Sequence, residues 1–455
     1  MTMPNQIATY VKLHRVPIAL VLLSLAFYYT FAYHLDRTDF VKLITLFASL
    51  FFLCFRIVRF EKWNMKFLLV TGMLFRLVFL LAEPNLSQDF YRFIWDGHLV
   101  ANLQNPYVAA PDFLIQQKDL VIPHAQVLYK GMGELSAQHF SNYPPLNQLF
   151  FALAALLGGR DLMGSIIAMR VVIVLSDLGI VYFGRKLLKN LNRSTHLIFW
   201  YFLNPLVIVE LTGNLHFEGV MLFFFVWALY LVSIKKWAWA AIPYALSICV
   251  KLVPLLFLPL FLKHLGVKKS LGFYILVGLC CLMLFVPFHS PEFIANYGQT
   301  VGLWFSNFEF NAGLYNLVKQ IAIQFDGKPW ELIKSYGTIT KVFTVSLVLL
   351  LTFFRKNEKL STLMGSMLWA LTLYYLVTPT VHPWYIAFLV VMGIFTDYRF
   401  ALIWSAAATL SYFAYAQPDF KENLVLLFVE YISVYAFIVY EIINLGKLKT
   451  IFHKK

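Results

Sequence analysis

The sequence predicts an all-α integral membrane protein that crosses the bilayer many times. Of its 455 residues, 60% are hydrophobic, 18% are aromatic and only 13% are charged, whereas a soluble domain carries about 25% charged residues. The mean hydropathy of +0.71 is typical of a polytopic membrane protein. The composition therefore argues against a soluble globular core.

The net charge of +14 would favour a nucleic-acid partner in a soluble protein, but the chain contains no nucleic-acid-binding motif. Lys and Arg gathered in cytoplasmic loops explain this charge, because such loops fix the orientation of membrane spans. No nucleic-acid partner is expected. The four cysteines lie in apolar runs without metal-ligand spacing, so neither a disulfide framework nor a metal site of cysteines is expected.

Apolar runs long enough to cross the membrane, about 20 residues each, predict the spans. They lie near 16–33, 40–58, 66–82, 164–184, 195–212, 217–233, 270–288, 339–354, 360–378, 383–397, 400–416 and 423–445. The run at 147–159 is too short to cross, and we expect it to dip into or lie on the outer face. The run at 237–264 is expected to cross twice, as two short helices that meet near Lys251. The sum is about 14 transmembrane helices (12–14), with both termini cytoplasmic.

The chain is interpreted as a single membrane-embedded domain, residues 1–455, with no internal repeat. Residues 1–65 are expected to form an accessory N-terminal helical hairpin. A first long external loop covers 83–163 and carries interfacial helices, and a second external loop covers 289–338.

Ionisable and polar residues at the membrane edge occur in four segments that the topology places on the external side or level with it. Inserting an ionised group into a membrane costs roughly 2.5–3.5 kcal/mol, so each such residue marks a candidate site. The residues are Asp89, Arg92 and Asp96; Asn214, His216 and Glu218; Lys251; and His382, Trp384 and Tyr385.

The stretch "SQDFYRFIWDG" predicts a helix that lies along the outer membrane surface. Asp89, Arg92 and Asp96 share one face at i, i+3 and i+7 spacing. Asp89 is either a general base beside a membrane-embedded substrate or an ordinary N-terminal helix charge. The interleaved Tyr91 and Trp95 favour the functional interpretation, although they also suit an interface anchor.

The other candidates also have structural interpretations. His216 and Glu218 suit a polar cap at the mouth of a span. Lys251 either snorkels to the interface or binds a phosphate between two short helices. His382 belongs either to a turn within an aromatic belt or to a site. Asp89 and Asp96 would lie roughly 10 Å apart along a helix, which is too far for one metal ion, so no metal is expected.

Five segments occur in an order that resembles a known superfamily. They are "SQDFYRFIWDG…NPY" (87–107), "YPPL" (143–146), "HFEG" (216–219), "KLVPLLFLPLFL" (251–262) and "HPWY" (382–385). From about residue 66 to 400, the chain is similar to the GT-C integral-membrane glycosyltransferases. It most resembles the polyprenyl-phosphate-mannose-dependent mannosyltransferases of the GT87 and GPI-mannosyltransferase type.

This resemblance implies an inverting glycosyltransferase that moves a sugar, mannose above all, from a polyprenyl-phosphate donor to an acceptor hydroxyl. It implies Asp89 as the catalytic base, no cofactor and metal-independent chemistry. Asp96 is a candidate second carboxylate, because some relatives carry an acidic residue where this chain has Gln88 or Phe90. For the donor phosphate, the expected ligands are Lys251, His382 and Arg92. For the sugar or acceptor they are Asp96, Trp95, His216, Glu218, Asn214, Asn105, Tyr107, Tyr143, Trp384 and Tyr385.

The expected partners are the polyprenyl-phosphate sugar, membrane lipids, and a glycolipid, glycan or protein acceptor. The basic loops suit a bacterial cytoplasmic membrane with the active site facing the periplasm or exterior, and the endoplasmic reticulum is the alternative location. A transporter or flippase of a lipid-linked sugar is the alternative function, since it would use the same pocket without forming a bond. Aminoarabinose transfer and protein O-mannosylation are weaker alternatives within the superfamily.

Overall fold

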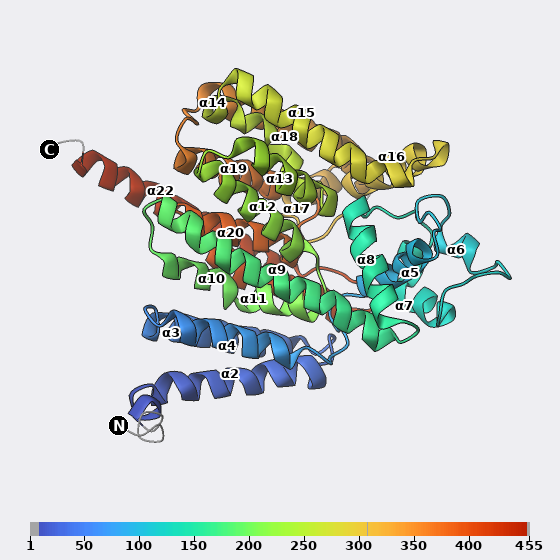
Figure 1. The fold of residues 1–455 in the computed structure, drawn as a ribbon, viewed down its shortest axis with the longest axis horizontal. Coiled ribbons are helices and arrows are strands. Elements are labelled where there is room, and N and C mark those ends of the chain that lie inside the picture. The colour runs from blue at the N-terminus through green and yellow to red at the C-terminus, as the bar shows by residue number, and fades with distance from the viewer. Residues whose placement is uncertain (1–8, 307, 453–455) are drawn as a thin grey trace.

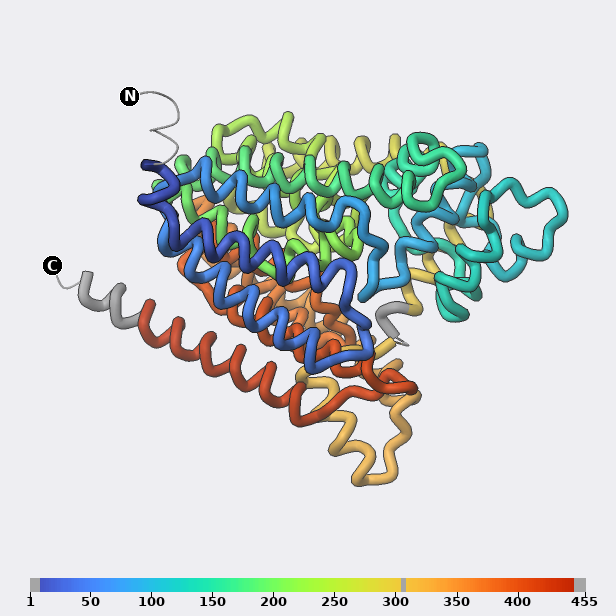
Figure 2. The backbone as a smooth tube through the Cα atoms, turned by 90° about the horizontal axis from the view of Figure 1, so that it is seen from below, coloured from blue at the N-terminus to red at the C-terminus, as the bar shows by residue number. Residues whose placement is uncertain are grey.

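The computed structural model describes residues 9–306 and 308–452. The regular secondary structure within them is helical, apart from one isolated bridge between Phe310 and Thr380. The predicted all-α class is confirmed. Figures 1 and 2 show long helices running side by side along the molecule. The start of the first long helix and the end of the last lie at one end, and the helices of residues 89–158 gather at the opposite end.

The N-terminal helices are α2 (Arg15–His34), α3 (Phe40–Phe60) and α4 (Met65–Val78). α2 packs against both α3 and α4 along one side of the bundle (Figure 1). Asp39 and Asn64 cap α3 and α4, because each side chain accepts a hydrogen bond from a backbone N–H in the first turn. The predicted spans at 16–33 and 40–58 coincide with α2 and α3.

A cap of short helices covers the end of the bundle opposite the termini: α5 (Asp89–Ala101), α6 (Pro111–Leu114), α7 (Ala125–Ala137) and α8 (Pro145–Gly158). α5 packs closely on α8, with the rings of Phe93 and Phe151 4.5 Å apart. Gly97 permits this approach, since a Cβ atom there would lie 2.3 Å from the Phe151 carbonyl oxygen. The helices predicted from "SQDFYRFIWDG" and at 147–159 are both confirmed.

The central helices follow α8. They are α9 (Leu162–Asn190), η1 (Thr195–Ile198), α10 (Phe199–Phe202), α11 (Pro205–Val207), η2 (Ile208–Gly213), α12 (Glu218–Ser233), α13 (Trp237–Val250), η3 (Val253–Leu260), α14 (Phe261–Leu265), α15 (Val267–Phe285) and η4 (Val286–Phe288). The predicted break near Lys251 is confirmed, because this residue is extended between α13 and η3. The second arm is mainly a 3₁₀-helix. Pro254 is tolerated in its first turn, and Pro259 inside it disfavours a regular α-helix because it lacks a backbone N–H and its ring clashes with the preceding turn.

The C-terminal part completes the bundle. Its helices are α16 (Pro291–Ser306), α17 (Gly313–Gln324), α18 (Pro329–Phe354), α19 (Leu360–Val377), η5 (Pro383–Tyr385), α20 (Ile386–Phe395), α21 (Phe400–Ala407), η6 (Ala408–Ala416) and α22 (Leu424–Phe452). Every residue of α20 is buried, as expected of a helix that is apolar on all sides. In contrast, α15, α18 and α22 expose apolar residues such as Leu271, Val342 and Phe428, which suits contact with lipid.

Seven helices in the described residues are long and apolar enough to cross a membrane, or up to eight if the bent pair Thr195–Phe202 and Pro205–Gly213 forms one span. They support an integral membrane protein. They are α2, α3, α9, α15 with η4, α18, α19 and α22. The predicted number of about 14 is not confirmed, because several predicted spans form helices of 10–17 residues, including α12 and α13.

A basic segment and a predicted loop are largely helical. The segment "RKLLKNLNR" (185–193), which follows the span predicted at 164–184, mostly forms the last turns of α9, which ends at Asn190, because Leu, Lys and Arg favour helix and no breaker interrupts them. The external loop predicted at 289–338 contains α16, α17 and the start of α18. α16 and α17 combine apolar with polar residues. Their sequences therefore form helices but were not predicted as membrane spans.

Candidate functional site

A cavity of about 1420 Å³ opens beside the cap of short helices. Its wall contains Asp89 and Arg92 of α5, Glu218 at the start of α12, Lys251 between α13 and η3, and His382 before η5. These residues come from the four segments that the sequence predicted to meet at one level. The structure brings them together around one space.

Asp89 is the first residue of α5 and is partly open to the cavity. The hydroxyl oxygen of Ser87 accepts a hydrogen bond from its backbone N–H at 3.2 Å, which holds the start of the helix. Its carboxylate accepts no hydrogen bond from the described residues. Burial raises the pKa of Asp89, the Glu218 and Glu210 carboxylates raise it further, and His216 and Lys251 act in the opposite direction. An unbonded carboxylate with a raised pKa is suited to accept a proton.

Arg92 and Asp96 form a buried ion pair, with Nε 2.7 Å from Oδ1. The other Asp96 oxygen accepts hydrogen bonds from Ser141 at 2.6 Å and Gln148 at 3.1 Å. Arg92 also donates to the carbonyl of Ser136 at 2.6 Å. Asp96 is fully buried behind the cavity wall, so its carboxylate joins α5 to the segments after α7, while Arg92 reaches the cavity.

Lys251 and Glu218 form a second ion pair, and this one faces the cavity. Lys251 Nζ lies 2.5 Å from Glu218 Oε1. Lys251 keeps 23% of its side chain exposed, and the second Glu218 oxygen has no hydrogen-bond partner within the described part of the chain. The pair therefore holds a cation in place without using all of its hydrogen-bonding capacity.

A row of stacked rings joins the segments "NLHFEG" and "HPWY". The His216 ring lies 3.8 Å from that of Trp384, which lies 4.3 Å from that of His382. His382 in turn stacks on Phe310 at 5.1 Å. Burial, together with the nearby His216 and Lys251, lowers the pKa of His382 to about 3. His382 is therefore neutral at physiological pH and offers a hydrogen-bonding nitrogen rather than a charge.

Glu210 is a buried acidic residue that is not among the site residues predicted from the sequence. It lies in the π-helical turn η2, and such turns often occur at functional sites. Its Oε1 accepts hydrogen bonds from Asn214 and from Tyr412, and its Oε2 lies 3.2 Å from His216 Nε2. Glu210 thus lies against His216, although neither of these two atoms has a hydrogen-bond partner in the described chain. The signal was present, since Glu210 is an acidic residue inside the predicted span 195–212.

The predicted sugar- and acceptor-binding residues divide into two groups. Glu218, Tyr143, Trp384 and Tyr385 line the cavity. The remaining residues are not part of its lining: Asp96, Trp95, His216, Asn214 and Tyr107, which are buried, and Asn105, which is partly exposed. For example, Asn105 donates a hydrogen bond to the Phe288 carbonyl at 2.8 Å, and Tyr107 donates to the Tyr143 carbonyl at 2.6 Å.

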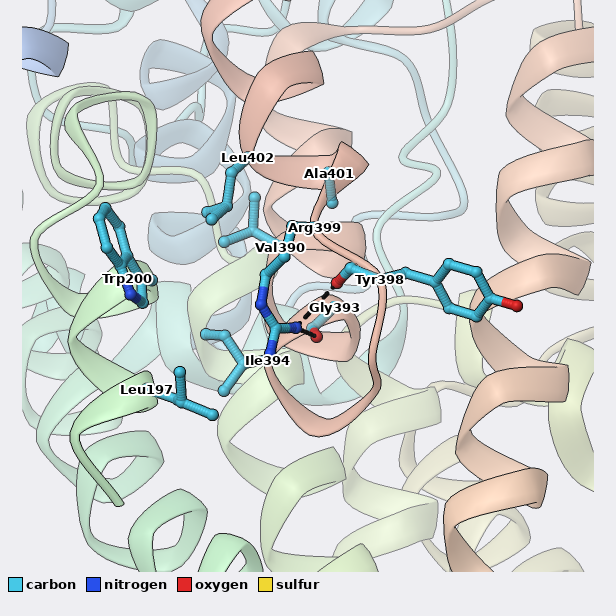
Figure 3. A pocket seen from close by; sticks show the side chains of 9 residues that line it. All are labelled: Leu197, Trp200, Val390, Gly393, Ile394, Tyr398, Arg399, Ala401 and Leu402. Atoms are coloured by element: carbon cyan, nitrogen blue, oxygen red, sulfur yellow. Dashed lines mark hydrogen bonds between the residues drawn. The ribbon is translucent and has the colours of Figure 1, made fainter. Parts of the chain in front are cut away.

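A much smaller hollow lies beside the turn between α20 and α21 (Figure 3). Its volume of about 10 Å³ is room for no more than one water molecule. Arg399 closes this turn by donating to the carbonyl oxygens of Gly393 at 2.6 Å and Tyr398 at 2.9 Å, as Figure 3 shows. This hollow is structural, and the large cavity is the candidate site.

A helical membrane protein with a charged, aromatic-lined cavity at one end of its bundle can bind a polar group that is attached to lipid. Residues 21–265, more than half of the chain, match the sequence model of a family described as alpha-(1->6)-mannopyranosyltransferase, N-terminal domain. The chain belongs to this family and is therefore a glycosyltransferase of the mannosyltransferase kind. No curated protein matches the chain.

The matched region begins inside α2 and includes most of the N-terminal hairpin. It also includes Asp89, Arg92, Glu218 and Lys251 of the cavity, whereas His382 lies beyond it. The resemblance to mannosyltransferases is confirmed at the level of this family.

Proposed function

We propose that this protein transfers mannose from a polyprenyl-phosphate donor to an acceptor hydroxyl, with inversion at the anomeric carbon and with Asp89 as general base. The observation that carries the proposal is the unbonded Asp89 carboxylate, with a raised pKa, in a cavity shared with the Lys251 cation. The family description names α-(1→6) mannosyl transfer. A primary 6-hydroxyl is therefore the acceptor group, and an inverting route to an α-linkage needs a β-linked donor.

The bond changes follow from these positions. Asp89 takes the proton of the acceptor hydroxyl, and the oxygen attacks the anomeric carbon of the mannose. The bond from that carbon to the phosphate oxygen breaks, and its electron pair leaves with the polyprenyl phosphate. Lys251 and Arg92 stabilise the departing charge as preorganised cations, and the neutral His382 contributes a hydrogen bond.

The apolar part of the cavity wall favours a donor that is attached to a lipid. Leu252, just before η3, and Leu255 and Leu256 of η3 face the same cavity as Thr344 and Val345 of α18. η3 packs against α18, and α18 is a membrane-length helix that exposes apolar residues. A prenyl chain can lie along this wall with its phosphate near Lys251. Trp384 and Tyr385 then offer ring faces to the sugar.

We further propose the GT-C architecture, with short apolar helices such as α12 and α13 adding to the membrane-length spans. In this arrangement the cap α5–α8 faces the exterior or periplasm of a bacterial cytoplasmic membrane. The chemistry is proposed to be metal-independent. Lys251 supplies the positive charge for which many transferases use a metal ion, and EDTA should leave the rate of transfer unchanged.

The test is transfer by the purified protein in lipid nanodiscs. Radiolabelled β-linked polyprenyl-phosphomannose is supplied with α-(1→6)-mannobiose as acceptor, and the new linkage is identified by NMR. We expect α-(1→6)-mannotriose, and no product when GDP-mannose replaces the lipid donor. Movement of the labelled lipid across a liposome without a new glycosidic bond would support the flippase alternative and contradict the proposal.

A further inference from the structure

One region of the large cavity is formed by segments that contain none of the site residues predicted from the sequence. Arg37 comes from the turn between α2 and α3, and Tyr415 and Phe420 come from the segment before α22. The Arg37 guanidinium carbon lies 5.5 Å from the centroid of the Tyr415 ring and 5.9 Å from that of Phe420. Chain segments more than 370 residues apart thus meet at the cavity wall.

Arg37 has hydrogen-bonding capacity that the protein does not use. Its guanidinium is partly exposed and makes no hydrogen bond or ion pair with the described residues. A guanidinium carries five N–H donors in a fixed plane. The two aromatic rings hold that plane, so its donors are available to a ligand in the cavity.

The neighbouring wall carries polar groups that are already held in place. Lys319 donates to Glu309. Glu422 accepts hydrogen bonds from the backbone N–H of Asn311 and, at 3.2 Å, from the Asn316 side chain. Side chains fixed in this way bind a ligand at low entropic cost.

The charges of this region identify the class of ligand. The lining of this region carries four cationic and three acidic residues: Arg37, Lys319, Lys341 and Lys421 against Glu309, Asp419 and Glu422. Because the carboxylates offset most of the positive charge, this wall does not strongly favour a phosphate over other ligands. Carboxylates, an amide and a guanidinium beside aromatic rings match the hydroxyl groups and ring faces of a neutral sugar chain.

We propose that this region is an acceptor subsite, which binds mannose units of an α-(1→6)-linked oligosaccharide beyond the unit that reacts at Asp89. This inference rests on the proposed function for the identity of the sugar. Arg37 donates hydrogen bonds to the hydroxyls of the acceptor, and Tyr415 and Phe420 stack against its rings. The N-terminal hairpin thereby takes part in acceptor binding.

The first test is binding of α-(1→6)-mannotetraose to the purified full-length protein without donor, measured by microscale thermophoresis. Arg37→Ala should weaken binding about tenfold, as expected when hydrogen bonds from a charged donor are lost, and Arg37→Lys should weaken it less. Arg160→Ala removes an exposed cation outside the cavity and should bind like the unmodified protein. Elution from size exclusion and the thermal midpoint verify that each variant is folded.

The second test is the acceptor-length dependence of transfer. The KM for mannotetraose should rise about tenfold in Arg37→Ala, the KM for mannobiose should rise less, and the KM for the lipid donor should stay within about twofold. An unchanged KM for mannotetraose would overturn the subsite, and so would the absence of mannotetraose binding. Loss of inorganic phosphate binding in Arg37→Ala, with mannotetraose binding kept, would also overturn it. Binding of mannotetraose that depends on Arg37, without any transfer, would contradict the proposed function and leave the subsite standing.

Discussion

Two ion pairs inside the protein differ in how completely they are bonded. Arg76 of α4 and Asp177 of α9 lie 2.8 Å apart with both side chains fully buried. Arg76 also donates to the carbonyl oxygens of Gly72 and Phe202, and the second Asp177 oxygen accepts a hydrogen bond from Tyr201 at 2.6 Å. This pair joins helices and is closed on all sides but one, since a single guanidinium nitrogen has no partner in the described chain.

The pair of Lys251 and Glu218 is left open by comparison. Lys251 faces the cavity, one Glu218 oxygen has no partner among the described residues, and the nearby Asp89 carboxylate accepts no hydrogen bond there. Burying charge is costly unless it is paired and hydrogen-bonded. Charges left incompletely bonded beside a cavity therefore indicate ligand binding, whereas buried charges bonded at nearly every position between helices indicate a structural role.

The largest expected effect is a loss of activity at the open site, where Asp89 lies beside the Lys251–Glu218 pair. Asp89→Asn should reduce kcat by about 10³-fold, within the range for loss of a general base. The thermal midpoint at neutral pH should stay the same or rise, because a carboxyl whose folded-state pKa is raised destabilises the fold when ionised. Transfer assays and scanning calorimetry measure the two quantities. Near-normal turnover in this variant would remove Asp89 from the mechanism.

The next effect concerns stability. Arg76→Met leaves Asp177 as a buried charge without its partner and should lower the free energy of unfolding by roughly 3–5 kcal/mol. The double variant Arg76→Met/Asp177→Leu should recover most of this loss, because no charge then remains buried. Unfolding in detergent measures both. If Arg76→Met instead changes the KM for the donor and leaves stability unchanged, the Arg76–Asp177 pair takes part in ligand binding, and its assignment as a structural pair is wrong.

The sequence predicted the helical class, the cap helices at "SQDFYRFIWDG" and 147–159, and the break at Lys251, because each follows from local apolar patterning and proline positions. It did not predict how Glu210 or Arg37 reach the site. Glu210 depends on a π-helical turn and on Tyr412, which is 202 residues away. Such pairings are set by tertiary packing, which local periodicity does not contain.

The same limit applies to the predicted sugar contacts. Trp95 and Asn105 lie in motifs next to the cavity but do not line it. Trp95 is fully buried, and the partly exposed Asn105 donates a hydrogen bond to the Phe288 carbonyl. The residue type and the position in the chain were suitable for a binding role. The side of the helix or turn that faces the cavity was decided by the contacts of α5 with α8, which no single motif reveals.

A smaller effect tests the cation of the open pair. Lys251→Met should lower kcat by about 10²-fold, as when one preorganised group that stabilises developing charge is lost. Lys251→Arg should keep part of the rate, because the charge remains. Lys263, outside the cavity wall, is the matched control, and Lys263→Met should leave kcat unchanged. Equal rates for Lys251→Met and Lys263→Met would exclude phosphate stabilisation by Lys251.

The smallest effect is a shift in pH dependence. Asp89 must be ionised to accept a proton, so kcat/KM should fall as the pH drops through its raised pKa. The Glu210 charge is one cause of that rise, and Glu210→Gln removes it while keeping a hydrogen-bond acceptor for Tyr412. The pKa of Asp89 then falls, and the acid limb of the profile moves to lower pH.

His382, with a pKa of about 3, stays neutral over this range and does not contribute. The exposed Glu331, at the start of α18, is the control, and Glu331→Gln should leave the limb in place. A shift of the limb to higher pH in Glu210→Gln would mean that the titrating group is not a carboxylate near Glu210, and the open cluster would then need a different base.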